Sequence, residues 1–123
     1  MNDPKIMVDS IDVNETDFRH FVWCSKDGIN DGTANDTGVL GGATIASHEV
    51  TLAKGNITIV STNANAVTIR HTDETAVTYA ADVAINVLLS AATGAEQIEL
   101  LCRIVTTDGR TLDQTMIVPI EEH

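Results

Sequence analysis

The sequence predicts an all-β protein, an antiparallel sandwich of about seven or eight short strands. Apolar and polar residues alternate with a period of two in several runs, and turn-forming residues separate these runs at intervals of about 8 to 12 residues. No window keeps a helical period over three turns. Aromatic residues make up only 3% of the 123 residues, so the core must be largely aliphatic, which suits sheets stacked face to face. The length fits one domain.

A C-terminal hairpin between Glu96 and Ile120 is the clearest element. One face of its first strand carries Ile98, Leu100, Cys102 and Ile104. The matching face of its second strand carries Leu112, Met116, Val118 and Ile120, and Gln114 interrupts it. Asp108-Gly109 lies between the strands and favours a two-residue type I′ turn. Because a slip of one residue would turn the apolar face to water, we expect a firmly set register.

The N-terminal part is expected to be an extended arm followed by a strand. Residues 1–13 predict an arm that serves either as an edge strand of its own domain or as a contact to a neighbour, and residues 14–123 predict the single sandwich domain. From Asp17 to Cys24 both faces carry ring or aliphatic groups, which predicts a strand covered on both sides for at least part of its length.

The middle of the chain reads as further short strands. A strand with a bulge near Ser47-His48 is expected over residues 43–52, because the alternation shifts there. Residues 82–89 alternate cleanly, so we reject the helix that the Ala and Leu content of residues 80–92 would otherwise allow. Residues 72–81 show no clear period. The other expected strands are residues 57–60 and 67–71.

Charge and cysteine content restrict the partners and the compartment. The formal net charge of -11 opposes binding to phosphate backbones and to anionic membranes, so neither nucleic acid nor a membrane is an expected partner. The chain has no apolar run of about 20 residues, and its N-terminus lacks the features of a secretion signal. We therefore expect a protein that stays in the cytosol where it is made. In a reducing compartment, Cys24 and Cys102 are expected as free thiols rather than a disulfide.

No motif in the chain supports catalysis. The sequence contains no nucleophile elbow, no phosphate-binding glycine loop and no pair of Cys or His at zinc spacing. The segment from Asp27 to Gly32 resembles a calcium loop only superficially, because Ile29 stands where an oxygen ligand is required and Gly38 where the closing Glu should be. We expect no enzyme, no cofactor and no metal site.

Four segments occur in an order that resembles a known family: residues 12–18, Trp23, residues 42–50 and residues 102–115. They resemble small bacteriophage virion proteins with an immunoglobulin-like sandwich, often labelled fiber-tail adaptor proteins. In that family an acidic segment leads into a strand that ends in Trp. A Gly-x-Thr-Ile-x-Ser segment then opens a strand, and the hairpin reads Arg-Ile-x-Thr-x-x-Gly-Arg. The chain departs from the family in a longer loop at Ser25 to Gly42 and in the turn after Leu89-Ser90.

The resemblance implies a virion structural protein, made in the host cytoplasm, that joins tail or neck components by protein-protein contacts and forms an oligomer in the particle. A capsid decoration protein on the head lattice and a secreted adhesion or sugar-binding module are the alternatives. Expected partners are tail, fiber, portal-neck or major capsid proteins. The long loop is the first candidate contact, because loops of more than about 12 residues are usually functional. The candidate contact residues are Asp27, Asn30, Asp31, Asn35, Asp36 and Leu40 in the loop, with Ile6 and Val8 in the arm.

Overall fold

The computed structural model describes residues 5–8, 11–12, 15–24, 39–70, 74–90 and 97–121. All regular secondary structure in these residues is β-strand, and none of them belongs to a helix that is long and apolar enough to cross a membrane. The strands are β1 (Lys5–Met7), β2 (Ile11–Asp12), β3 (Thr16–Val22), β4 (Ile45–Lys54), β5 (Thr58–Asn63), β6 (Val67–Arg70), β7 (Ala76–Tyr79), β8 (Ala84–Ser90), β9 (Gln97–Thr106) and β10 (Thr111–Glu121).

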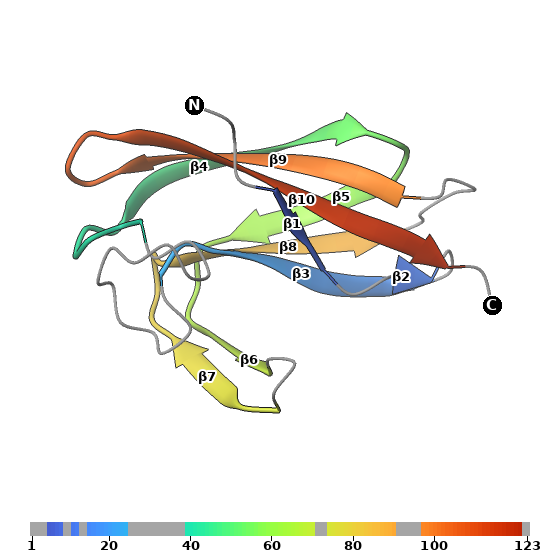
Figure 1. The fold of residues 1–123 in the computed structure, drawn as a ribbon, viewed down its shortest axis with the longest axis horizontal. Coiled ribbons are helices and arrows are strands. Elements are labelled where there is room, and N and C mark those ends of the chain that lie inside the picture. Colours follow the sequence, from blue (N-terminus) through green and yellow to red (C-terminus); the bar gives the residue numbers. More distant parts are fainter. Residues whose placement is uncertain are drawn as a thin grey trace.

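One sheet of the sandwich is organised around the C-terminal hairpin. Its strand order is β1-β10-β9-β4, and β2 also pairs with β10 (Figure 1). β9 and β10 are antiparallel and place Cys102 opposite Gln114, which confirms the predicted hairpin. β1 and β2 both run parallel to β10, and Ile6 lies opposite Met116. The described parts of the N-terminal arm therefore extend the chain's own sheet.

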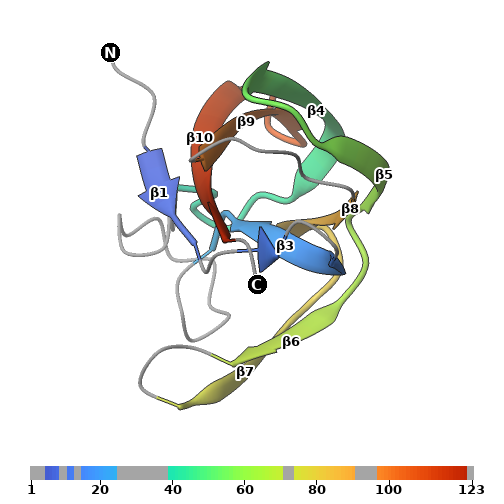
Figure 2. The same ribbon diagram turned by 90° about the vertical axis from the view of Figure 1, so that its right-hand side faces the viewer.

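The second sheet has the order β3-β8-β5, and all its strands are antiparallel. It packs against the first sheet, as the end-on view in Figure 2 shows, so the predicted all-β sandwich is confirmed. The strand at β8 also confirms that residues 80–92 do not form a helix. β6 and β7 form a separate hairpin on the outer side of the second sheet.

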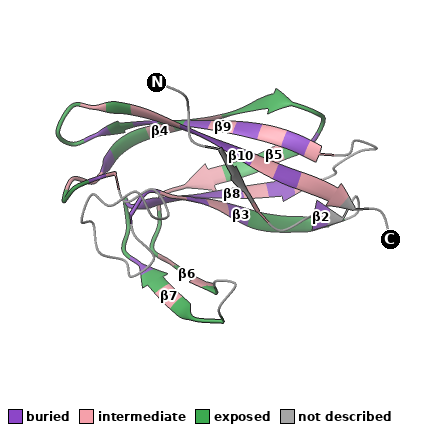
Figure 3. Cartoon of the chain, viewed as in Figure 1, coloured by how far each residue is buried: buried purple, intermediate pink, exposed green. Residues whose placement is uncertain are grey.

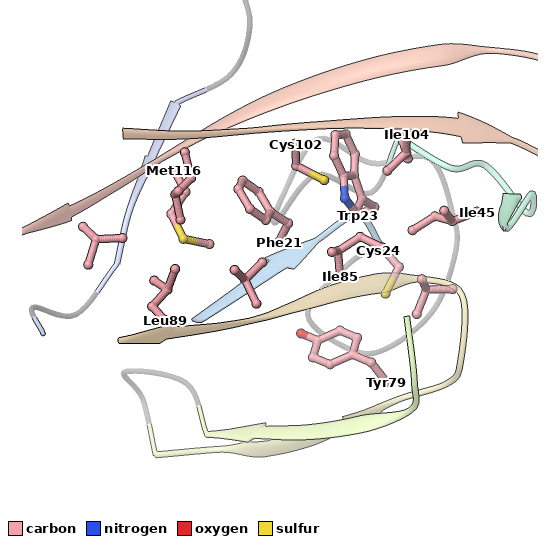
Figure 4. Packing of buried hydrophobic residues seen from close by; sticks show 14 of the residues in the cluster. Phe21, Trp23, Cys24, Ile45, Tyr79, Ile85, Leu89, Cys102, Ile104 and Met116 are labelled. Atoms are coloured by element: carbon pink, nitrogen blue, oxygen red, sulfur yellow. The ribbon is translucent and has the colours of Figure 1, made fainter. Parts of the chain in front are cut away.

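The core lies between the two sheets, where the buried and exposed residues alternate along the strands (Figure 3). The inward residues of β9 predicted from the alternation are all fully buried: Ile98, Leu100, Cys102 and Ile104. Phe21 of β3 and Trp23, which directly follows β3, fill the space beside them (Figure 4). Cys24 and Cys102 are both buried, and no disulfide joins them.

The β6–β7 hairpin covers part of the outer face of the second sheet. Tyr79 is fully buried and lies between β8 and this hairpin (Figure 4). The outward residues His20 and Val22 of β3 are half-buried, whereas Phe18, farther from the hairpin, is exposed. The prediction of a strand covered on both sides for part of its length is therefore confirmed.

The turn of the C-terminal hairpin differs from the prediction. A type I′ turn needs a positive φ at both central residues, but Gly109 has φ 89 and Asp108 has no positive φ. The Gly109 N–H donates to the Thr106 carbonyl at 3.0 Å, and the Thr106 N–H donates to the Arg110 carbonyl at 2.8 Å. These bonds define a three-residue loop in which a left-handed glycine follows a type I turn. The predicted two-residue turn is wrong, because the bond between Thr106 and Arg110 adds one residue to the loop.

The predicted bulge in β4 is present, one residue earlier than expected. The register with β9 shifts between Ile45 and Ser47, so Ala46 is the inserted residue. The four residues of β7 are a strand that the sequence pattern did not reveal. β7 is only four residues long, so its alternation, with Val77 and Tyr79 more buried than Ala76 and Thr78, covers too few residues to be recognised in the sequence.

A candidate interaction surface at one end of the sandwich

Three chain connections meet at one end of the sandwich. β3, β5 and β9 end there, and β4, β8 and β10 begin there (Figure 1). The long loop that was expected to contact a partner is the connection from β3 to β4. We call the described part of this end, residues 39–44, 81–83 and 107–110, the tip surface.

Arg110 fixes the last part of the long loop to the hairpin. Its Nη1 donates to the carbonyl oxygen of Val39 and its Nη2 to that of Leu40, both at 2.8 Å. Its Nε lies 3.1 and 3.0 Å from the two carboxylate oxygens of Asp108, which orients the guanidinium group. Hydrogen bonds from a charged donor are stronger than neutral ones, so this contact holds the loop backbone in one position.

Thr107 strengthens the same junction. Its N–H donates to the Thr44 carbonyl at 2.8 Å, and its Oγ1 accepts from the Thr44 N–H at 3.1 Å. The Ala43 N–H donates to the Leu40 carbonyl at 2.9 Å, which closes the turn before β4. Residues 39–44 and the hairpin tip therefore form one rigid unit.

The 81–83 turn joins this unit from the second sheet. The Asp82 carbonyl accepts from the Ile45 N–H at 2.9 Å, and the Asp82 N–H donates to the Ala64 carbonyl at 2.8 Å. Asp82 has a positive φ of 67, which Asp tolerates better than most residues. Main-chain bonds thus tie both sheets together beneath the tip surface.

Leu40 does not act as the surface contact that the sequence suggested. Its side chain is 0% exposed and belongs to the hydrophobic core. The following glycines, Gly41 and Gly42, have φ values of 58 and 95 and allow the chain to turn out of the core after Leu40. Leu40 is therefore an anchor for the loop, and only its neighbours reach the surface.

The other predicted contact residues divide into two groups. Asp27, Asn30, Asp31, Asn35 and Asp36 lie outside the described residues. In the arm, Ile6 pairs with Met116 through β1, and the Val8 N–H donates to the Ile117 carbonyl at 3.0 Å. The Val8 side chain is half-buried against the core, so it is largely used within its own domain.

The tip surface is acidic, although at the hairpin the charge of Arg110 balances that of Asp108. The hydrogen bond from Thr106, followed by that from Arg110, holds the pKa of the Asp108 carboxyl below its usual value, so the group is an anion. Asp82 adds a second exposed carboxylate. In the sequence, residues 25–38 carry three Asp and one Lys.

A polar row crosses the outer face of the second sheet, away from the tip surface. The side-chain oxygen Oδ1 of Asn86 accepts from His20 Nδ1 at 2.7 Å, and Asn86 Nδ2 donates to Asn63 Oδ1 at 2.9 Å and to the main-chain carbonyl of Asn65 at 3.1 Å. Burial lowers the pKa of His20 below 6.5, and the bond to Asn86 acts against this effect. The row satisfies polar groups beneath the β6–β7 hairpin and gives His20 a structural role.

The described residues contain no group of three or more His, Cys, Asp or Glu side chains that could hold a metal ion. Burial raises the pKa of the Cys102 thiol to about 12, which suppresses its reactive thiolate form. Residues 39–44, 81–83 and 107–110 form a platform that is held together by the hydrogen bonds of Arg110, Thr107 and Asp82.

Sequence reasoning missed Arg110, Thr107 and Thr44 as residues that build this platform. Arg directly after Asp-Gly was a signal, because a long cation at a hairpin tip can reach neighbouring main-chain carbonyls. Its target could not be inferred, since Leu40 is 70 residues away in sequence. Comparison with protein-family models gives no match to this chain, and comparison with curated proteins gives none either.

Proposed function

We propose that this chain is a structural protein of a bacteriophage virion, an adaptor that joins tail or neck components by protein-protein contacts through its tip surface. The resemblance of the segments around Trp23, residues 42–50 and residues 102–115 to virion adaptor proteins suggests this role. The observation that carries the proposal is the double hydrogen bond from Arg110 to Val39 and Leu40. It ties the hairpin motif to the residues directly before the motif at residues 42–50, and the bonds between Thr107 and Thr44 join the two motifs themselves.

The strand order supports an immunoglobulin-like form of the sandwich. The sheet β3-β8-β5 corresponds to strands B, E and D of that fold, and β10-β9-β4 corresponds to strands G, F and C. In this correspondence the long loop is the B–C connection and residues 107–110 are the F–G connection. In antibody variable domains these two loops lie at the binding end of the domain. The tip surface occupies the equivalent place.

Rigidity at the base of the loop favours partner binding. Contact groups that are already held in place, as residues 39–44 are by Arg110 and Thr107, lose less conformational entropy when a partner binds. The carboxylates of Asp82 and Asp108 and the net charge of -11 favour a partner with a basic contact surface. Both features suit a protein that docks at a fixed place in a larger assembly.

The test is to purify particles of the phage that carries this sequence and to quantify the chain by mass spectrometry. An adaptor is expected in tens of copies per particle, on order-of-magnitude symmetry grounds, and a capsid decoration protein in hundreds. Copies in the hundreds would support decoration of the head lattice instead. Absence from purified particles, together with binding of the free protein to a glycan array, would favour the adhesion module and overturn the proposal.

A further inference from the structure

The open edge of the second sheet is a strand that could pair with another chain. β3 is an edge strand, because β8 is its partner on one side and no described strand pairs with the other side. The Trp23 N–H donates to the Val83 carbonyl at 3.0 Å. Hydrogen-bonded positions alternate in an antiparallel pair, so Phe18, five residues earlier, directs its N–H and C=O groups away from β8.

The N–H and the C=O of Phe18 are both already hydrogen-bonded to charged side chains. Asp17 Oδ1 accepts from the Phe18 N–H at 2.8 Å, and Arg19 Nη1 donates to the Phe18 carbonyl at 2.7 Å. The same Nη1 lies 3.2 Å from Asp17 Oδ2, so the two side chains also form an ion pair. The residues on either side of Phe18 thus satisfy the hydrogen-bonding groups that an added strand would need.

The position of Arg19 is unusual for a charged residue. In the alternation of β3 it shares the inward face with Phe21 and Trp23, and its side chain is only 11% exposed. A charged side chain that points inward on an edge strand is one of the devices by which soluble β-proteins prevent edge-to-edge association. Here the guanidinium group turns to the edge and reaches the main chain.

Without the contacts of Asp17 and Arg19, β3 would be prone to pair with another chain. The run from Phe18 to Trp23 contains three of the four aromatic residues of the chain, and Phe18 is 41% exposed on the outer face. Aromatic residues favour strands, and exposed apolar strand edges pair readily with other chains. A second copy of β3 could lie antiparallel to the first about a twofold axis at Phe18, so that each Phe18 would bond the other.

We propose that Asp17 and Arg19 form an edge guard that keeps β3 from pairing with β3 of a second copy of this chain. The proposal stands on the geometry of β3 alone and goes beyond the proposed function. Because both Phe18 main-chain groups are occupied, two copies cannot form the central bonds of a shared sheet. Removing the two side chains frees these groups beside the exposed ring of Phe18.

The experiment compares the wild-type protein with the double variant Asp17→Ala/Arg19→Leu by analytical ultracentrifugation at matched concentrations. The Leu keeps apolar bulk at the inward position while the guanidinium is lost. The expected result is an apparent mass about twice that of the wild type, because twofold pairing joins two units. In addition, hydrogen exchange at the Phe18 amide should be faster in the single variant Asp17→Ala, whose exposed position leaves the core intact.

Two controls separate loss of the guard from a general effect. The variant Asp113→Ala/Arg103→Leu removes the ion pair between β9 and β10 and leaves the edge of β3 unchanged, so its apparent mass should equal that of the wild type. Adding Phe18→Pro to the double variant Asp17→Ala/Arg19→Leu removes the main-chain N–H at residue 18 and should restore the wild-type mass. The proposal would be overturned if the folded double variant kept the wild-type mass. It would also be overturned if the Phe18 amide of Asp17→Ala exchanged at the wild-type rate, or if Phe18→Pro did not restore the wild-type mass.

Discussion

Arg110 Nη2 donates a hydrogen bond to the main-chain oxygen of Leu40 at 2.8 Å, although 70 residues separate the two in the sequence. The same guanidinium group bonds the carbonyl of Val39 and the carboxylate of Asp108. A single side chain therefore couples the hairpin turn to the end of the long loop. This coupling turns two separate connections into one surface.

Arg110→Leu is expected to lower the free energy of unfolding by about 1–3 kcal/mol, because two charge-assisted bonds to main-chain carbonyls are lost. Hydrogen exchange at the Ala43 amide, which bonds Leu40, should become faster. Urea denaturation and exchange by NMR measure the two effects.

Arg103→Leu is the matched control. Its bidentate pair with Asp113 is solvent-exposed, so its loss should cost at most about 1 kcal/mol and leave the Ala43 exchange unchanged. Equal effects of the two variants would contradict a special role of Arg110.

Gln114→Met is expected to stabilise the protein by about 1 kcal/mol. The Gln114 side chain is 0% exposed, and neither its oxygen nor its nitrogen has a hydrogen-bond partner. A buried polar group without partners costs about 1–3 kcal/mol, which a thioether of similar length avoids. The midpoint of urea denaturation should therefore rise, while Met116→Leu on the same face should shift it little. A lower midpoint for Gln114→Met would show that the amide has a favourable role in the core.

Cys102 should make the protein lose stability in strong base. Burial raises the pKa of its thiol from 9.0 in the unfolded chain to about 12 in the folded protein, while Trp23 acts in the opposite direction. Below pH 9 both states carry the thiol, so the contribution to stability is complete. Between pH 9 and 12 the unfolded state releases the proton first, and the stability falls. The free energy of unfolding measured against pH should fall less steeply in Cys102→Ala than in the wild type. Parallel curves would contradict the prediction.

Gly55 and Gly109 offer a test of packing against backbone strain. Their φ values are 91 and 89, so alanine is strained to a similar degree at both positions, by about 1–2 kcal/mol. A Cβ at Gly55 would lie 2.5 Å from Ile98 Cγ2 and 3.1 Å from main-chain atoms, whereas at Gly109 nothing lies within 4 Å. Gly55→Ala should therefore destabilise the protein more than Gly109→Ala, by roughly 1–3 kcal/mol beyond the strain. Thermal unfolding of both variants measures the difference, and equal losses would show that Ile98 moves aside.

Much of the sandwich could be predicted from local alternation. The inward residues of β9 follow a strict period of two, because one face of that strand packs on the core and the other meets water. The clean alternation of β8 likewise decided between strand and helix. The burial pattern of β9 can therefore be predicted from consecutive residues, whereas in β8 the alternation identifies the strand but not the burial of Ala84 and Asn86.

The tip surface could be predicted only in part. The loop and the hairpin were recognised, but Leu40 was taken for a surface contact, since nothing in Gly38-Val39-Leu40-Gly41 shows that the core accepts its side chain. The turn type also escaped prediction, because the three-residue loop depends on the bond between Thr106 and Arg110. Contacts made by side chains to distant main-chain groups leave no periodic trace in a sequence.

Site-specific photo-crosslinking in assembled particles tests the central claim most directly. A photoreactive residue replaces Ala81, which is exposed in the tip surface, or Asn56, which is exposed in the turn between β4 and β5 at the opposite end. After irradiation of purified particles, the Ala81 position is predicted to form a covalent adduct with another virion protein, and the Asn56 position is not. An adduct at Asn56 with none at Ala81 would contradict the assignment of the tip surface as the site of partner contact.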